Sequence, residues 1–444
     1  MDKLALQNAT HNPFMGRVAP FPFTNTKTRD SSERLGLWTA SLAIWLLVFR
    51  DPLTNKLVFV LLCALFVWVC SRRNSNQTSD RHTLTVGCFL FGCRSLALIL
   101  IGETTPSAFM AEIISPFANC VVLFFIMTRV ATNIRAVYFL ALQYAYARAV
   151  ECAVFGLVGE VIPDWIDNLR PAIVNYSSYD DSLSQASLVD ASRDVDRLIG
   201  LFSCNAVEVA SVLCIVLAIL GGSLIVKFSF ARLAFLAVCV VACAMTWSRT
   251  GVMGMVIISF LYMILLRRGN LISAGIVAIV ASLMFTWFYA FIVDRLSNDD
   301  RLRSSETVDI RLEVQSAYLK NLKSAGPFGI GLPLERLAAV VVPEFGISSE
   351  SAYIGAFFSA GWLGGIGFLV VVVRAICLSV AGLRIGINGR ESLAFISMRA
   401  IPMVALFTFA VLISTYYYLW SSFDIWFLAS LAFVTSQIPA SSVR

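Results

Sequence analysis

The sequence predicts an all-α fold, a polytopic transmembrane helix bundle of about twelve spans, with two large extracytoplasmic loops that carry amphipathic helices. Three observations predict it. Of the 444 residues, 58% are apolar and only 14% are charged, whereas soluble domains contain about 25% charged residues. The apolar runs are of helical length, well beyond the roughly 10 residues of a barrel strand. Basic residues also alternate between successive connections, as a membrane topology requires.

Segments that are long and apolar enough to span occur along most of the chain. The second of them begins at residue 56, and both it and the first are short for a span. The segment 83–101 contains Arg94, which we expect to be the one clear charge in the middle of a span. In order, the expected spans are 35–49, 56–70, 83–101, 112–128, 134–151, 200–221, 229–247, 250–266, 271–293, 350–373, 396–413 and 416–435.

The distribution of charge gives the expected orientation. Arginine and lysine are concentrated in the connections 71–82, 129–133, 222–228, 267–270 and 374–395 and their flanks, where Asp80 and Glu391 are the acids. By the positive-inside rule these connections are cytoplasmic, and so are both termini. The connection that holds Arg50, Asp51 and Lys56 departs mildly from the rule. The net charge of +6 therefore follows the membrane sides, and we expect no nucleic-acid partner.

This topology divides the chain into six parts. They are a cytoplasmic tail (1–34), spans one to five (35–161), a periplasmic loop (162–199), spans six to nine (200–293), a large periplasmic loop (294–349), and spans ten to twelve with a short cytoplasmic end (350–444). Long loops in a compact helical protein are usually functional or disordered.

The second large loop shows signs of helices. Val308, Leu312, Leu319 and Leu322 fall near helical spacing, and Gly326-Pro327 supplies a stop. A shorter apolar-faced stretch follows at Leu334–Val341. We expect two amphipathic helices over the outer mouth of the bundle. No inverted pair of broken helices is evident in the sequence, which is the pattern that would indicate a secondary transporter.

Metal and cofactor chemistry is not indicated. The eleven cysteines form no CxxC or Cys/His pattern, and the two histidines, His11 and His82, fall on the cytoplasmic side. Neither a metal site nor a cofactor is therefore expected.

Arginine at the outer face is the remaining candidate chemistry. Arg249, in Ser248-Arg249-Thr250-Gly251, connects two expected spans with almost no loop, so its guanidinium belongs near the headgroup level. An interfacial snorkelling role is the alternative. Arg311 falls on the expected loop helix, where pairing with Asp309 or Glu313 on a solvated face is equally compatible with the sequence.

Other polar residues complete the candidate set. Arg197 immediately precedes span six and could equally be an interface anchor, whereas Arg303 lies close to Asp299 and Asp300 and could pair with them. Glu350, at the start of span ten, is the acid candidate, although it would also serve as a helix N-cap. Fixed guanidinium groups would stabilise the charge that develops on a diphosphate leaving group without a metal. A nearby carboxylate could then accept the proton of an acceptor hydroxyl.

Several stretches between about residues 190 and 370 together resemble the O-antigen polymerase/ligase family of bacterial inner-membrane proteins. They are Arg197-Leu-Ile-Gly-Leu-Phe-Ser-Cys-Asn205, Ser248-Arg249-Thr250-Gly251, Arg311 followed by Ala325-Gly-Pro-Phe-Gly-Ile-Gly331, and Glu350-Ser-Ala-Tyr353 with Gly361-Trp-Leu-Gly364. Each stretch is weak alone, and their order and spacing carry the resemblance. Cys204 stands where the family usually has proline.

The resemblance implies a metal-independent glycosyltransferase, a polymerase that joins undecaprenyl-diphosphate-linked repeat units of a surface polysaccharide at the periplasmic face of the inner membrane. Carried over by position, it implies that Arg249 and Arg311 bind the diphosphate. Together with the residues described above, we expect catalytic roles for Glu350, Arg249 and Arg311, and substrate binding by Arg197, Arg249, Arg311, Arg303 and Tyr353. The expected partners are the lipid-linked donor and acceptor, membrane lipids and a chain-length regulator protein. Ligases of the family have a His-Asn pair where Glu350-Ser351 stands here. A ligase acting on lipid A-core is the nearest alternative, and a transporter of a lipid-linked or anionic solute is another.

Overall fold

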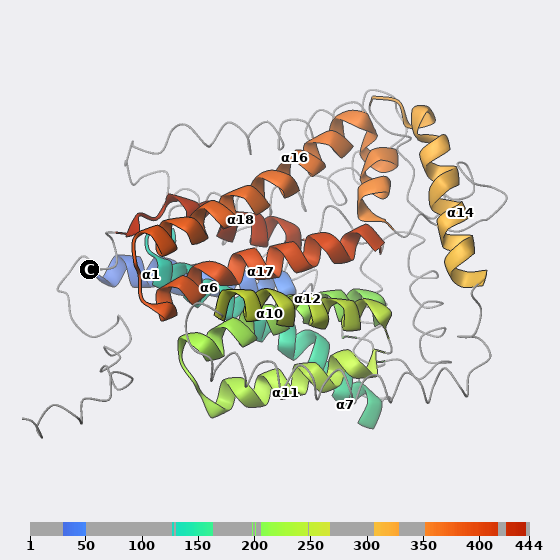
Figure 1. The fold of residues 1–444 in the computed structure, drawn as a ribbon. Helices are drawn as coiled ribbons and strands as arrows, with labels where there is room; N and C mark the ends of the chain where they lie inside the picture. Colours follow the sequence, from blue (N-terminus) through green and yellow to red (C-terminus); the bar gives the residue numbers. More distant parts are fainter. Residues whose placement is uncertain are drawn as a thin grey trace, which may run out of the picture.

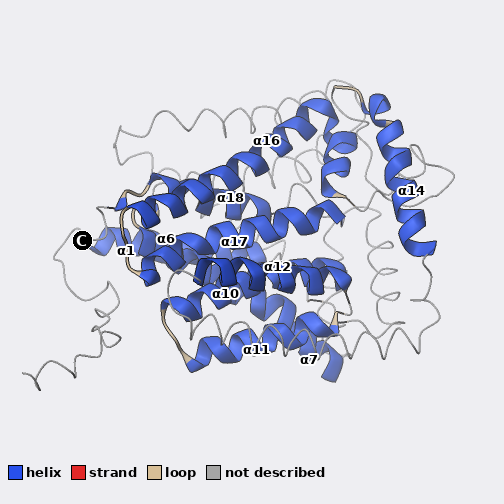
Figure 2. Ribbon diagram, viewed as in Figure 1, coloured by secondary structure: helices blue, strands red, loops and turns tan. Residues whose placement is uncertain are grey.

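The structure is a computed structural model that describes residues 30–49, 127, 130–162, 198, 200, 206–246, 248–266, 306–327, 351–415 and 423–440. All regular structure in these residues is helical, without a strand (Figures 1 and 2). The elements are α1 (Asp30–Val48), α6 (Ile134–Arg148), the π-helical turn η3 (Ala149–Val154), α7 (Phe155–Val161), α10 (Ala206–Val226), α11 (Phe230–Met245), α12 (Arg249–Leu266), α14 (Glu306–Lys320), the 3₁₀ turn η4 (Leu322–Ala325), α16 (Ala352–Asn388), α17 (Leu393–Thr415) and α18 (Phe423–Gln437).

Three helical segments are long and apolar enough to cross a membrane: Ala206–Val226, Gly361–Asn388 and Leu393–Ser414, with mean hydropathies of 2.7, 2.5 and 2.0. The expectation of an all-helical chain with membrane-spanning segments is thus confirmed for the described residues. Twelve spans and the two extracytoplasmic loops stay predictions. The expected spans 56–70, 83–101 and 271–293 lie outside the described residues, and so does 112–128 apart from Met127.

The helices run in alternating directions, which packing contacts establish. At one end of the bundle, a Cβ built at Gly251 in the first turn of α12 would lie 3.5 Å from Ala210 Cβ near the start of α10 and 2.8 Å from Cys243 Sγ near the end of α11. The Tyr353 hydroxyl, near the start of α16, donates to the Ala410 carbonyl near the end of α17 at 2.9 Å. The helices α10, α12 and α16 begin at this end, where α11 and α17 finish (Figure 1). The directions agree with the alternation that the sequence predicts.

We call this end the α14 end, because α14 and η4 pack there against the start of α16. Val314, Tyr318, Ala325 and Phe358 form a small hydrophobic cluster separate from the main core. The Tyr318 and Phe358 rings meet edge to face, with centroids 5.3 Å apart. A helix is therefore present where one was predicted and a turn follows at Gly326, whereas the extracytoplasmic position of this segment stays a prediction. The predicted apolar face is wrong in part, because Leu319 is 57% exposed and the buried face carries Val314 and Tyr318 instead.

The helix α16 differs from expectation in two ways. It has a break at Gly361, whose φ of 70° is a backbone conformation that glycine adopts without a Cβ penalty. Across this break, the Trp362 and Leu363 backbone N–H groups donate to the carbonyls of Gly326 and Pro327. The helix then continues to Asn388, beyond the expected span 350–373, so Arg374 and Arg384 belong to a helix rather than to an irregular connection.

The opposite end, which we call the Arg399 end, is held by a buried ion pair. Arg399 is fully buried in α17 and binds Glu391 through two hydrogen bonds, Nε to Oε2 at 2.8 Å and Nη2 to Oε1 at 2.9 Å. Its Nη1 donates to the Thr435 carbonyl near the end of α18 at 3.1 Å. One guanidinium thus joins α17, α18 and the turn that follows α16. Arg232 acts similarly nearby, donating to the carbonyls of Ser223 and Lys227 at the end of α10.

Candidate functional site

Arg249 is the first residue of α12, at the α14 end of the bundle. Its neighbour Ser248 starts the helix: the Ser248 hydroxyl accepts from the Thr250 backbone N–H at 3.2 Å, and the Ser248 carbonyl accepts from the Gly251 N–H at 3.1 Å. No acidic residue occupies the first turn of α12. By contrast, α10, which begins at the same end, carries Glu208 in its first turn. The tight turn expected around Arg249 is therefore observed in the backbone.

Arg311 belongs to α14, at the same end of the bundle. Position 311 precedes Val314 by three residues and Tyr318 by seven, so by helical register it shares the face that packs against α16. Glu313, the partner proposed for a solvated pair, is exposed and lies off that register. The side chain of Arg311 lies outside the part of the structure that is described, and its role stays a prediction.

The remaining predicted residues have mixed outcomes. Tyr353 is half-buried near the start of α16, where its hydroxyl already donates to the Ala410 carbonyl and its ring packs 5.6 Å from Phe368. Arg197, Arg303 and Glu350 lie outside the described residues. The helix that Glu350 was expected to cap has Ser351 at its N-cap position.

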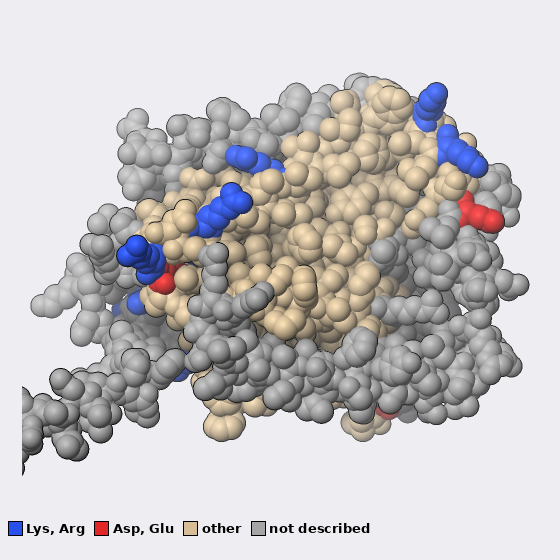
Figure 3. Space-filling model, in the orientation of Figure 1, with Lys and Arg blue, Asp and Glu red and all other residues tan. Residues whose placement is uncertain are grey.

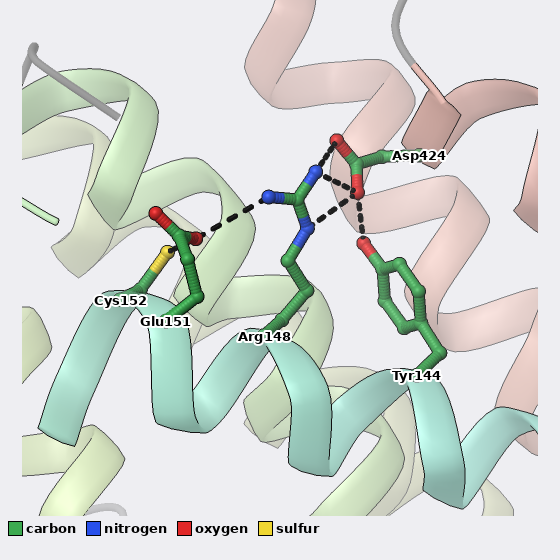
Figure 4. Close-up of polar contacts among 5 residues, drawn as sticks. All are labelled: Tyr144, Arg148, Glu151, Cys152 and Asp424. Atoms are coloured by element: carbon green, nitrogen blue, oxygen red, sulfur yellow. Dashed lines mark hydrogen bonds and ion pairs between the residues drawn. The ribbon is translucent and has the colours of Figure 1, made fainter. Parts of the chain in front are cut away.

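A buried polar cluster near the same end was missing from the sequence-based set (Figure 4). Arg148, the last residue of α6, binds Asp424 of α18 with three hydrogen bonds: Nε to Oδ1 at 3.0 Å, and Nη2 to both carboxylate oxygens at 2.8 Å. The Tyr144 hydroxyl donates to the same Oδ1 at 2.5 Å. On the other side, Arg148 Nη1 donates to Glu151 Oε2 at 3.3 Å. The Cys152 thiol also donates to Glu151 Oε2, at 2.7 Å.

Burial makes this cluster energetically important. Arg148 is 2% exposed, and Tyr144, Glu151, Cys152 and Asp424 are fully buried. A charge removed from water costs several kcal/mol unless it is paired with good geometry. Here the guanidinium meets one carboxylate in a fork and touches a second, which satisfies several of its N–H groups. The result is a strong link between α6 and α18.

Two residues of the cluster lie in a π-helical turn of the backbone. Glu151 and Cys152 lie in η3, a π-helical turn in which the Phe155 N–H reaches back to the Val150 carbonyl. Such turns are rare in helices and occur often at functional sites. Glu208 in the first turn of α10 is close enough to act electrostatically on Cys152. The cluster thus joins α6, η3 and α18 in the half of the bundle next to the α14 end, with α10 alongside.

The cluster corrects one sequence-based inference. Arg94 was expected to be the single clear charge inside a span, yet Arg148, Glu151 and Asp424 are buried among apolar helices. All three fall within expected spans, 134–151 and 416–435. Charged residues inside membrane spans are rare and are functional candidates by default, so this signal was present in the sequence.

Among the residues that the structure describes, no group of three or more His, Cys, Asp or Glu side chains could hold a metal ion. Two features therefore remain as candidates: the arginine positions at the α14 end and the buried carboxylate–guanidinium cluster between α6 and α18. No family model matches this chain, and no curated protein matches it.

Proposed function

We propose that the chain is a membrane-embedded glycosyltransferase that polymerises polyprenyl-diphosphate-linked oligosaccharide repeat units at the extracytoplasmic face. The observation that carries the proposal is the location of Arg249 and Arg311. These positions are far apart in sequence, yet the helices that contain them, α12 and α14, meet the same end of the bundle. A guanidinium from each helix could therefore reach one diphosphate at that end.

The position of Arg249 within its helix supports an anionic ligand. The first turn of a helix has exposed N–H groups and the positive end of the helix dipole, which disfavour a cation by about 0.3–1 kcal/mol. An arginine as the first residue of α12, without an acid in that turn, is favourable when an anion binds there. A diphosphate fits because its oxygens accept the bidentate hydrogen bonds of guanidinium.

In this reaction, the two arginines stabilise the diphosphate as the sugar–phosphate bond of the donor breaks. Glu350 accepts the proton of the acceptor hydroxyl, and the hydroxyl oxygen forms the new glycosidic bond. Tyr353 holds the start of α16 against α17 through the Ala410 carbonyl, which fixes the backbone beside Glu350. The alternation of helix directions and the excess of arginine at the Arg399 end are consistent with a cytoplasmic Arg399 end.

The test uses Arg249→Ala and Arg311→Ala in cells that depend on this protein for surface polysaccharide. Both variants are expected to remove the ladder of long chains and leave single repeat units on the lipid acceptor, because the leaving group loses its stabilisation. Glu313→Gln is the matched control, since Glu313 is exposed on α14 away from the inward register. Normal ladders in both arginine variants would contradict the proposal.

A transporter of a lipid-linked or anionic solute is a second candidate, and the Arg148–Asp424–Glu151 cluster favours it. Intramembrane charges and interrupted helices are typical of transport pathways, and α16 is broken at Gly361. Purified protein in vesicles distinguishes the two functions. Formation of polymer from lipid-linked repeat units without other proteins supports the polymerase, whereas movement of those units across the bilayer without polymer supports the transporter.

A further inference from the structure

The Arg399 end has exposed cations that no contact described so far explains. Arg135 at the start of α6, Arg384 near the end of α16 and Arg390 in the following turn are all exposed. Arg135 lies over the Phe395 ring at the start of α17, with its guanidinium carbon 5.4 Å from the ring centroid. Among the side chains described at this end, the carboxylate of Glu391 is already bound by Arg399. The exposed charge of these side chains is therefore positive.

Figure 3 shows the same asymmetry on one face of the molecule: Lys and Arg are gathered towards the end where α16 finishes and α17 begins. The α14 end is different. There Glu160 and Glu313 are exposed together with Lys320 and Lys323, so both signs are present. Of the two ends, the Arg399 end is the one whose described surface attracts anions.

Exposed aromatic rings accompany the cations. The turn between α10 and α11 carries Phe228, which is 59% exposed, and Phe230, which is 80% exposed. Their rings meet edge to face with centroids 5.3 Å apart. The turn beneath them is held by buried Arg232, whose Nη1 donates to the Tyr138 hydroxyl at 2.8 Å and to the Lys227 carbonyl at 3.1 Å. Two large apolar rings are thus kept projecting from a fixed turn.

An apolar hollow adjoins this turn. It is a small depression between the ends of α10 and α12 and the start of α17. Its lining residues are Ile225, Tyr262, Leu265, Leu393, Ile396, Ser397 and Ala400. Ile225 is close in sequence to the Phe228 turn, and Ile396 follows Phe395, the residue that Arg135 covers. Apolar space therefore lies next to exposed positive charge.

We propose that the Arg399 end is a docking surface for anionic phospholipid, with the headgroup phosphate at the exposed arginines and acyl chain against the Phe228–Phe230 turn and the adjoining hollow. Charge complementarity selects an anionic headgroup, since basic residues at a membrane surface contribute about 1 kcal/mol each towards anionic lipid. The apolar rings and hollow select a lipid over a soluble anion. This surface is at the opposite end from the proposed diphosphate site, and its role does not depend on the glycosyltransferase proposal.

The experiment uses the full chain reconstituted in bilayer discs of phosphatidylcholine, with and without phosphatidylglycerol, and measures the midpoint of thermal unfolding. Phosphatidylglycerol is expected to raise the midpoint of the wild-type protein, because a ligand of the folded state stabilises it. In the variant Arg135→Gln/Arg384→Gln/Arg390→Asn, phosphatidylglycerol should raise the midpoint by less than half as much as it does in the wild-type protein. Asn is chosen at position 390 because Arg390 has a φ of 52°, which Asn tolerates. The control is Lys320→Gln/Lys323→Gln at the α14 end, which should keep the full rise.

Two further measurements test whether the whole lipid is needed, rather than its headgroup alone. Phe228→Ser/Phe230→Ser should reduce the rise while leaving the arginines unchanged, and soluble glycerol phosphate added to phosphatidylcholine discs should produce no rise. The proposal is overturned if wild type shows no rise, if the arginine variant keeps the full rise, or if glycerol phosphate raises the midpoint as much as the lipid does. Each variant is compared with its own midpoint in phosphatidylcholine. A variant that is less stable in phosphatidylcholine therefore still shows whether phosphatidylglycerol stabilises it.

Discussion

Arg148 and Asp424, which are 276 positions apart in the sequence, are joined in the interior of the bundle by three hydrogen bonds of 2.8 to 3.0 Å. The pair connects the end of α6 to the first turn of α18. Asp424 also accepts from Tyr144, whose ring stacks on Phe427 with centroids 4.4 Å apart. Packing and charge thus fix the same interhelical contact.

Removing one partner of this pair should be costly. Asp424→Asn and Arg148→Gln are each expected to lower the free energy of unfolding by about 3 kcal/mol or more, because each leaves a buried charge poorly compensated. The double variant should lose less than the sum of the two, since neither charge is then left alone. Unfolding in detergent or bilayers, followed by helical circular dichroism, measures all three.

The control for these three variants is Lys320→Gln, an exposed lysine on α14 whose replacement should change stability by no more than about 0.5 kcal/mol. Additive effects of the two buried substitutions would show that Arg148 and Asp424 do not interact in the folded protein.

Close contact between α10 and α12 depends on glycine. A Cβ at Gly254 would lie 2.3 Å from Cys214 Sγ and 3.1 Å from Leu412 Cδ1. Gly254→Ala should therefore lower the free energy of unfolding by about 1–3 kcal/mol through overpacking. Adding Cys214→Ala, which removes the nearest atom, should restore most of the loss.

Gly221→Ala is the comparison for this prediction, because its Cβ would meet only an ordinary contact of 3.8 Å with Tyr262. Gly221→Ala should be neutral or slightly stabilising, since alanine is a better helix former. Equal losses at the two glycines would mean that helix propensity, rather than the Cys214 contact, controls the Gly254 result.

The sequence predicted the helical class of the described residues, because helix formation depends on local hydropathy. The tight turn before α12 and the turn at Gly326 were also predicted, since turn formation is a local property of the chain. The pairing of Arg148 with Asp424 depends on which distant helices become neighbours, which local patterns do not specify. The break of α16 at Gly361 is likewise tied to a tertiary contact, the carbonyl of Gly326.

The small cluster at the α14 end should be sensitive to alkaline pH. Burial raises the pKa of Tyr318 to about 12, above its ordinary value of 10.0. Between these values the unfolded chain releases the phenolic proton and the folded chain keeps it, so stability falls as the pH rises through this range. Tyr318→Phe should flatten that part of the pH dependence, measured as the midpoint of thermal unfolding. An unchanged slope in Tyr318→Phe would assign the alkaline loss to other groups.

Diphosphate binding at the proposed site requires the planar guanidinium of arginine and not only a positive charge. Lysine carries the same charge as arginine but lacks the planar fork that binds two phosphate oxygens at once. Arg249→Lys should therefore lower the rate of polymer formation by purified protein in lipid vesicles by about 100-fold, approaching the loss in Arg249→Ala. Lys323→Arg, at an exposed position of η4, is the control and should leave the rate unchanged. A lysine variant with the wild-type rate would mean that position 249 needs only a cation at the membrane interface, and a snorkelling role would then replace diphosphate binding.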